Sequence, residues 1–334
     1  MAVRCKSLDE FAGHQTRRRW LMSTAAALST PVWAQEWAPK RAISLIVPYT
    51  PGGSADIGAR MLAPELSQLL GQTVVVENVP GAGGALAMKK LIQSPADGHT
   101  LLYGGVSEAL LVPMINPAAG YKPDDLQPLA LVGSSPIVLT VRPNFPAQNV
   151  DELIELLRKN PGRFSYGSAG IGSFAHVMGE ALKEKAGVFV VHIPYRGGQQ
   201  LLNDVIGGQL DIAISTATNA AGMLATKRIN ALGISSPQRV EVLKDVATFA
   251  ESKSLKDVEM SVWALMFAPK GTPSAVLNRL SAAINQVQML PAMKAARVQL
   301  AAELPSLMNP AQATAFLAAE QARYRTVTAR IKPE

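Results

Sequence analysis

Residues 43–60 constrain the fold of this chain more than any other stretch. A β-branched, apolar run, ISLIV, ends in the Pro/Gly-rich loop PYTPGG, which passes directly into SADIGAR. We therefore expect a buried strand, a ligand loop and a helix that starts near Ser54. Gly52 and Gly53 let the backbone approach a ligand, because no Cβ stands in the way. Two interpretations stay open: an anion site at the helix N-terminus, or an ordinary turn whose helix is capped by Ser54 or Asp56.

The same strand, glycine loop and helix pattern recurs. Residues 72–94 repeat it as TVVVEN, PGAGG and ALAMKKLIQS, and residues 163–187 repeat it as RFSYGS, AGIG and SFAHVMGEALKEKAG. Alternating strands and helices predict a mainly parallel sheet, which binds ligands at the carboxyl ends of its strands. Gly81 and Gly83 match part of a dinucleotide fingerprint, but the third small position falls on Leu86, which argues against a nucleotide site.

The length of 334 residues favours two lobes, because one hydrophobic core rarely grows to this size. Two apolar stretches, at residues 128–141 and 260–268, are interpreted as the crossings between them. We expect one lobe to comprise residues 35–138 and 262–334, and the other to comprise residues 139–261. The helical C-terminal part is expected to pack and not to bind.

Composition excludes several classes of protein. Apolar residues make up 48% of the chain and charged residues 17%, with 26 Gly and 23 Pro spread throughout, so neither a disordered nor a fibrous chain fits. Beyond the first 34 residues, no basic run is longer than Lys89-Lys90, and aromatics are few, so we expect no nucleic acid partner.

The first 34 residues have the three parts of a secretory signal. Three arginines at positions 17–19 precede an apolar stretch that runs through Leu28, and small Ala34 marks the expected cleavage site. The paired arginines favour twin-arginine export, with the general secretory route as the alternative. Cleavage would leave 27 basic and 23 acidic residues, a net charge of +4, and would remove Cys5, the only cysteine. We therefore expect a periplasmic protein without a disulfide or a lipid-anchoring cysteine.

Enzymatic motifs are weak. The segment GVSEA at residues 105–109 approaches a nucleophile elbow around Ser107, but Ala stands where that motif needs a second Gly. The histidines that follow the signal, His99, His176 and His192, lack metal-ligand spacing, and there is no Walker A segment. We predict no catalytic residue, no metal and no cofactor.

Several motifs together resemble the Bug family, also called the tricarboxylate-binding (TctC) receptor family, of extracytoplasmic solute receptors. They are VPYTPGGSADIGAR, VENVPGAGGALA, SPADGHTLL, YGSAGIGSFAHVMGEAL, IPYRGGQQLLNDVIGGQLDIAI and APKGTPSAVLNRL, and they occur in order from about Arg41 to the C-terminal helices.

The resemblance implies an α/β, two-lobe periplasmic binding protein of the type II-like, Venus flytrap kind, with a mainly parallel sheet in each lobe. Such a protein would close as a monomer on a small carboxylate and deliver it to the inner-membrane subunits of a tripartite tricarboxylate transporter. Two alternatives stay open: a ligand sensor for a signalling partner, and a periplasmic hydrolase acting through Ser107.

The resemblance also implies which residues bind the ligand, largely through backbone amides and bridging water. Together with Ser107 and Ser215 at the ends of predicted strands, the expected ligand-binding residues are Tyr49, Thr50, Pro51, Gly52, Gly53, Ser54, Asp56, Ser168, Ala169, Gly172, Ser173, His176, Tyr195 and Arg196.

This chain departs from the family pattern where the far end of the ligand should lie. Ser215-Thr216 replaces the aromatic or Met and Asp that are common there, and Glu108 stands among positions that are usually small. A carboxylate in an anion cleft would repel the ligand unless it points away or meets an ammonium group. The role of Glu108 and the identity of the acid stay open.

Overall fold

The computed structural model describes residues 37–256, 258 and 261–328, and the predicted export signal lies outside them. Residues 43–60 fold as predicted into β1 (Ile43–Val47), a loop and α2 (Ser54–Leu70). The four apolar residues of β1 are fully buried. Burial on both faces explains why its sequence is a continuous apolar run and does not alternate.

The first lobe is built on a parallel sheet. β1 lies between β2 (Val74–Asn78) and β3 (Thr100–Gly105) and pairs in parallel with both. α2 packs against β1 and β2, and α3 (Ala85–Ile92) packs mainly against β3.

The second lobe repeats this plan. Its parallel strands are β5 (Ser165–Ser168), β6 (Val191–Pro194) and β7 (Ile212–Thr216). Its remaining elements are α5 (Val150–Lys159), α6 (Phe174–Ala186), α7 (Gly198–Ile206), α8 (Ala217–Ala225) and β8 (Asn230–Ile234).

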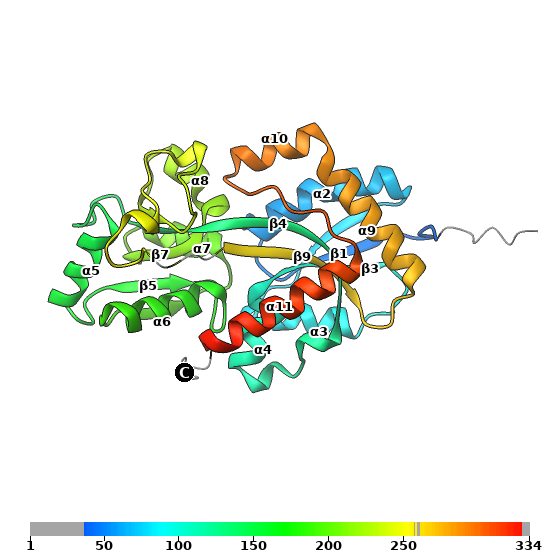
Figure 1. The fold of residues 1–334 in the computed structure, drawn as a ribbon, viewed down its shortest axis with the longest axis horizontal. Helices are drawn as coiled ribbons and strands as arrows, with labels where there is room; N and C mark the ends of the chain where they lie inside the picture. The colour runs from blue at the N-terminus through cyan, green and yellow to red at the C-terminus, as the bar shows by residue number, and fades with distance from the viewer. Residues whose placement is uncertain (1–36, 257, 259–260, 329–334) are drawn as a thin grey trace, which may run out of the picture. The chain divides into compact units, whose positions relative to one another are not determined.

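Two long strands, β4 (Leu126–Val141) and β9 (Ser261–Pro269), lie next to each other in the middle of the sheet, and β4 continues from the first lobe into the second (Figure 1). They pair with each other antiparallel as far as Pro136, and from Ile137 onward β4 pairs with β7 and β8 instead. The resulting strand order is β2-β1-β3-β9-β4-β7-β5-β6. Parallel pairing is therefore confined to the two ends of the sheet, and the crossing strands pair antiparallel.

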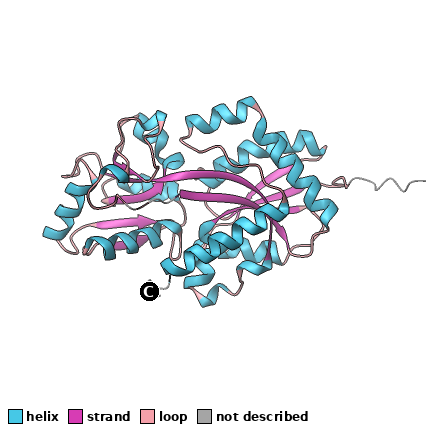
Figure 2. Cartoon of the chain, in the orientation of Figure 1, coloured by secondary structure: helices cyan, strands magenta, loops and turns pink. Residues whose placement is uncertain are grey.

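The C-terminal helices follow the predicted pattern: α9 (Ser274–Met289), α10 (Pro291–Gln299) and α11 (Pro310–Thr328). α9 and α11 pack against β4, and α9 also contacts α2 (Figure 2). Among the residues that the structure describes, no helix combines the length and the apolar character needed to cross a bilayer.

Two helical segments were not predicted. The residues that follow β3 form a π-helical turn, Ser107–Leu111, that continues into α4 (Val112–Ile115). Leu110 and Leu111 are fully buried, so the turn is stabilised by packing that local residue signals do not reveal. α8, which begins just after β7, was also missed.

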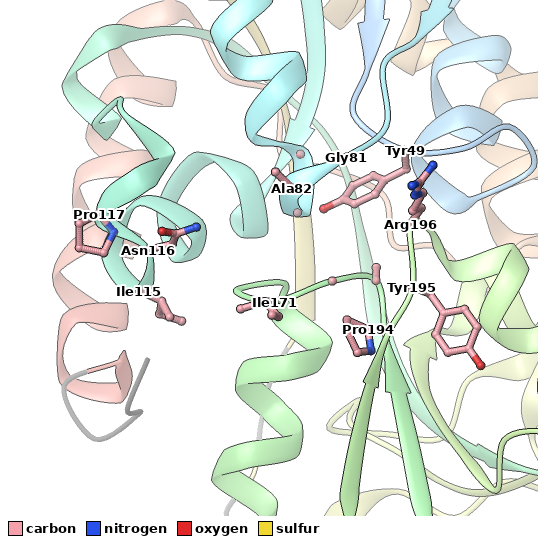
Figure 3. Close-up of a pocket in the computed structure, with 14 residues that line it drawn as sticks. Tyr49, Gly81, Ala82, Ile115, Asn116, Pro117, Ile171, Pro194, Tyr195 and Arg196 are labelled. Carbon is pink, nitrogen blue, oxygen red and sulfur yellow. The ribbon is translucent and has the colours of Figure 1, made fainter. Parts of the chain in front are cut away.

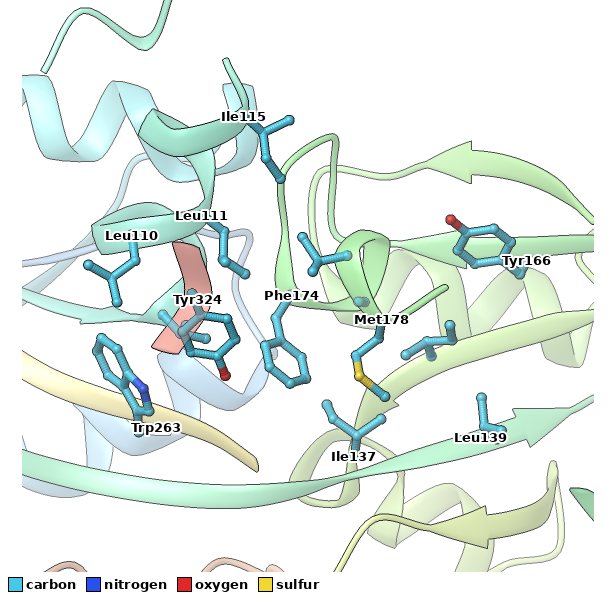
Figure 4. Close-up of a cluster of buried hydrophobic side chains, with 14 of the residues drawn as sticks. Leu110, Leu111, Ile115, Ile137, Leu139, Tyr166, Phe174, Met178, Trp263 and Tyr324 are labelled. Atoms are coloured by element: carbon cyan, nitrogen blue, oxygen red, sulfur yellow. The ribbon is translucent and has the colours of Figure 1, made fainter. Parts of the chain in front are cut away.

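A cluster of buried side chains joins the two lobes to α11 (Figure 4). The ring of Phe174 on α6 meets Tyr324 of α11 edge-on, with ring centroids 6.2 Å apart. Trp263 of β9 and Leu111 belong to the same cluster. This apolar contact holds the start of α6 close to the first lobe.

Candidate ligand-binding site

Three cavities lie around Tyr49, which lines all of them. The large cavity, of about 430 Å³, lies between the turn of Gly81 and Ala82 and the segments that carry Ile171 and Pro194 (Figure 3). Two smaller cavities have volumes of about 90 and 100 Å³. We call the first of these the serine cavity, because Ser54, Ser107, Ser173 and Ser215 line it, and the second the Arg297 cavity.

The N-terminus of α2 at the serine cavity has no side-chain cap. Gly53 occupies the N-cap position, and the first helical hydrogen bond runs from the amide of Ile57 to its carbonyl. Within the described part of the chain, the amides of Ser54, Ala55 and Asp56 have no acceptor. These amides and the helix dipole attract an anion, which favours an anion site over a capped turn.

Asp56 does not cap this helix. Its carboxylate accepts hydrogen bonds from the Gly52 amide at 3.0 Å and from the side chains of Arg60 and Asn78. Although burial alone would raise the pKa of Asp56, these hydrogen bonds hold it below its ordinary value. Asp56 therefore fixes the shape of the loop that leads into α2.

The N-terminus of α6, on the other side of the serine cavity, is occupied. Ser173 accepts a hydrogen bond from the amide of His176, and the hydroxyl oxygen of Ser107 accepts one from the amide of Phe174 at 2.9 Å. Ser107 belongs to the first lobe and α6 to the second, so this hydrogen bond joins the lobes. The two helix starts that looked alike in sequence differ: one is open and one is capped.

Asn219 of α8 adds a polar group that was absent from the predicted site. It lines the serine cavity, and its side-chain oxygen is buried without a hydrogen-bond partner in the described structure. Gly198 makes room for it, because a Cβ there would lie 1.9 Å from the Asn219 amide nitrogen. A hydrogen-bond donor in the cavity, such as water, would satisfy the oxygen.

Glu108 lies in the wall of the Arg297 cavity and is almost completely buried. Its carboxyl accepts hydrogen bonds from the hydroxyl of Tyr49, at 2.8 Å, and from the amide of Gly105. Burial raises the pKa of Glu108 to about 7, and these hydrogen bonds lower it only in part. Burial and the neighbouring Glu108 also raise the pKa of Tyr49. A neutral Glu108 would remove the repulsion that its sequence position suggested.

The cavities bring together just over half of the predicted ligand-binding residues. Those that line the serine cavity are Tyr49, Gly53, Ser54, Ser107, Ala169, Ser173 and Ser215, and those that line the large cavity include Tyr195 and Arg196. The others line none of the three cavities: Thr50, Pro51, Gly52, Asp56, Ser168, Gly172 and His176.

Two of these remaining residues, on either side of the glycine loop before α6, have hydrogen-bond partners within the protein. The Ser168 hydroxyl hydrogen-bonds with Nε2 of His192 at 2.7 Å, and Nδ1 of His176 accepts from the amide of Gly172 at 3.2 Å. The rings of His176 and His192 are stacked 4.4 Å apart. These contacts support the loop, and direct ligand contact by Ser168 and His176 stays a prediction. No group of three or more His, Cys, Asp or Glu residues suited to a metal occurs among the described residues.

Comparison with known proteins assigns the family and the fold. Residues 58–332 match the family model described as the tripartite tricarboxylate transporter family receptor, TctC. The chain belongs to this family. The match confirms the resemblance found in the sequence, and it identifies the chain as a member of a family of solute-binding receptors and not of enzymes.

Relatives of this TctC receptor agree with that assignment. A UPF0065 protein of Bordetella pertussis is 39% identical over 254 residues, which cover 76% of this chain and 78% of that protein. Among solved structures, the periplasmic binding protein BugD has a TM-score of 0.83 and 32% identity, covering 87% of this chain and 98% of its own. The two-lobe α/β fold predicted from the sequence is confirmed.

Two further structures of the same fold contain ligands. MatC from Rhodopseudomonas palustris with bound malate has a TM-score of 0.83 and 28% identity, covering 86% of this chain and 99% of that one. Rpa4515 of R. palustris with adipate has a TM-score of 0.83 and 28% identity, covering 87% and 97%.

Proposed function

We propose that this chain is a periplasmic receptor that captures a small carboxylate in the serine cavity and delivers it to the membrane subunits of a tripartite tricarboxylate transporter. The three arginines at positions 17–19, outside the described residues, support export. The relatives solved with malate and adipate support a carboxylate as the ligand.

The observation that carries this proposal is the uncapped start of α2. Ser54 and Ala55 line a small cavity, and their amides have no acceptor among the described residues. A backbone amide without an acceptor is energetically unfavourable. A bound carboxylate would accept charge-assisted hydrogen bonds from these amides. The cavity is small, so the bound group is a carboxylate end and not a bulky one.

We further propose that the ligand binds between lobes that close as a monomer. The pairing of β4 with β9 ends at Pro136, and its pairing with β7 begins at Ile137. This change of pairing partner supports a hinge near residue 138, where we expect the boundary between the lobes. The hydrogen bond from Phe174 to Ser107 exists only while the lobes touch. A ligand that contacts both lobes would favour this closed arrangement.

Replacement of Gly53 by Asp tests the site. Gly53 has φ −79° and ψ 167°, which any residue adopts, and an added Cβ would lie no closer than 3.6 Å to its nearest neighbour. Aspartate is a favoured N-cap residue, so its own carboxylate would bind the amides that we assign to the ligand. We expect affinity for carboxylates to fall at least about tenfold in titration calorimetry. The unfolding free energy should stay the same or rise by a few tenths of a kcal/mol.

Gly222→Asp is the matched control. It adds the same charge to an exposed glycine of α8, where an added Cβ meets nothing within 4 Å. The control should bind like the wild type. Unchanged carboxylate affinity in Gly53→Asp would refute the assignment of this site.

A further inference from the structure

Arg297 of α10 is a buried cation without an acidic partner. Only 6% of its surface is exposed, and it lines the Arg297 cavity. Both of its hydrogen bonds come from Nη2, one to the carbonyl of Val132 at 2.7 Å and one to the side-chain oxygen of Gln288 at 3.3 Å. Within the described residues, Nε and Nη1 have no acceptor and the guanidinium has no ion pair. An arginine stays charged in proteins, so this burial is costly unless a counter-charge arrives.

A second donor converges on the same place. The hydroxyl of Tyr103 has no hydrogen bond with any described residue, and it lines the cavity with Arg297. A Cβ added to Gly133 would lie 3.2 Å from this hydroxyl and 3.3 Å from Nη1 of Arg297. The two donors therefore meet beside Gly133, in a cavity of about 100 Å³ that holds no carboxylate paired with Arg297.

Glu108 lines this cavity but does not neutralise Arg297. Its two oxygens accept hydrogen bonds from Tyr49 and from the amide of Gly105, and it forms no ion pair with the guanidinium. The positive charge of Arg297 is left for another anion.

The Arg297 cavity adjoins the serine cavity. The residues that line both are Tyr49, Ser54, Ala55, Ser107, Thr216 and Val262. From Ser54, the Arg297 cavity extends along α2 past Gly58. Gly58 lies four residues after Ser54, which corresponds to about 6 Å along the helix axis. Ile57, Met61 and Leu300 add apolar wall. Two polar ends separated by an apolar wall suit a ligand with two acid groups on a short aliphatic chain.

We propose that the ligand is an aliphatic dicarboxylate with one carboxylate at the start of α2 and the other at Arg297 and Tyr103. This inference rests on the proposed function and adds the residue that selects a second acid group. The planar guanidinium presents its N–H groups to a carboxylate in a matching geometry.

Titration calorimetry on the wild-type chain tests the preference directly. The probes are succinate, glutarate and adipate, each compared with its own monomethyl ester, which keeps the same carbon chain between the two acid groups, loses one charge and adds one methyl group. At one or more lengths we expect the diacid to bind about 10- to 100-fold more tightly than its monoester. Equal affinity at every length would overturn the inference while leaving the carboxylate receptor intact. Failure of every acid to bind would instead contradict the proposed function.

Variants then assign the preference to Arg297. We expect Arg297→Gln to bind diacid and monoester with the same affinity, close to that of the wild type for the monoester. Arg297→Lys keeps the positive charge but lacks the planar guanidinium, so it should keep part of the preference for the diacid over the monoester. Arg142→Gln removes one positive charge from a residue that lines neither cavity, and it should bind like the wild type.

Two results would contradict the assignment to Arg297. If Arg297→Gln weakens diacid and monoester equally, the side chain only ties α10 to β4 through Val132. If chloride raises the melting temperature of the wild type but not of Arg297→Gln, and the diacid shows no preference, the cavity holds an inorganic anion and the dicarboxylate inference is wrong.

Discussion

At the scale of single residues, Glu108 illustrates how position in the fold sets the chemistry of a side chain. The sequence places a carboxylate where an anionic ligand is expected, and the structure buries it against Tyr49 and the amide of Gly105. Tyr121 donates to its backbone carbonyl, and Tyr103 and Arg297 share its cavity. The surroundings shift its pKa to about 7, so protonation decides whether it repels an anion.

This shift predicts a pH-dependent stability. The folded pKa of about 7 lies above the ordinary value of 4.5, so the folded state holds the proton more tightly. The resulting stabilisation is complete below pH 4.5 and is lost as the pH rises through about 7, a change of about 3 kcal/mol. Denaturant unfolding of the wild type and of Glu108→Gln between pH 5 and 8 would measure it. The unfolding free energy of the variant should lack this part of the pH dependence. If it changes with pH in the same way for both proteins, the pKa of Glu108 is not raised as described.

Site residues could be predicted from the sequence where they lie at the end of a predicted strand or the start of a predicted helix. Gly53 and Ser54 follow a strand and precede a helix, and Ser107 ends another strand, so their place at a cavity could be read from the sequence. Arg297 could not, because it is an ordinary residue in a helix and only the fold brings it to a cavity wall. Asn219 does have such a signal, since it lies just past the end of β7, but it was not among the predicted ligand-binding residues. Arg297 places a C-terminal helix at a cavity wall, and the expectation that these helices pack and do not bind stays a prediction.

At the scale of elements, the serine cavity lies between two helix starts of different character. α2 follows Gly53 without a side-chain cap, whereas α6 is capped by Ser173 and by Ser107 from the other lobe. In the proposed function, the ligand would therefore bind the free amides of α2, and the cap of α6 would depend on contact between the lobes.

Replacement of Ser107 by Ala tests that contact. It removes the acceptor for the Phe174 amide and should destabilise the chain by about 1 kcal/mol. Because the lost hydrogen bond joins the lobes, we also expect small-angle X-ray scattering of the ligand-free variant to give a larger radius of gyration. Asn149→Ala is the control, since it removes a similar cap from α5 within one lobe. An equal radius of gyration for both variants would show that Ser107 does not hold the lobes together.

Helices were predicted correctly where the spacing of apolar residues and the capping residues indicate the same boundaries. Ser173 and Gly187 bound α6 as the sequence indicated, with Gly187 in the left-handed conformation. The π-helical turn after β3 was missed because it depends on buried contacts of Leu110 and Leu111 with distant segments. Sequence neighbours carry no signal of such contacts.

At the scale of the whole molecule, the long strand β4 connects the two lobes. It pairs with β9 in the first lobe and with β7 and β8 in the second, and loops at the ends of β1, β3, β5 and β7 line the serine cavity. The repeated motifs predicted this plan, because each lobe has its own strand, glycine loop and helix. The antiparallel pairing of the crossing strands could not be read from local residue patterns, since pairing partners are distant in sequence.

The measurement that tests the central claim most directly is titration calorimetry of the chain from Gln35 onward, stripped of carried-over ligand, with small carboxylates and their neutral carboxamides. The account predicts that at least one carboxylate binds and that its carboxamide, of nearly the same shape, does not, because the open amides of α2 require a negative charge. A bound carboxylate at a hundredfold excess over its dissociation constant should also add about 2.7 kcal/mol to the unfolding free energy. Equal binding of acid and amide, or no binding by any carboxylate, would contradict it.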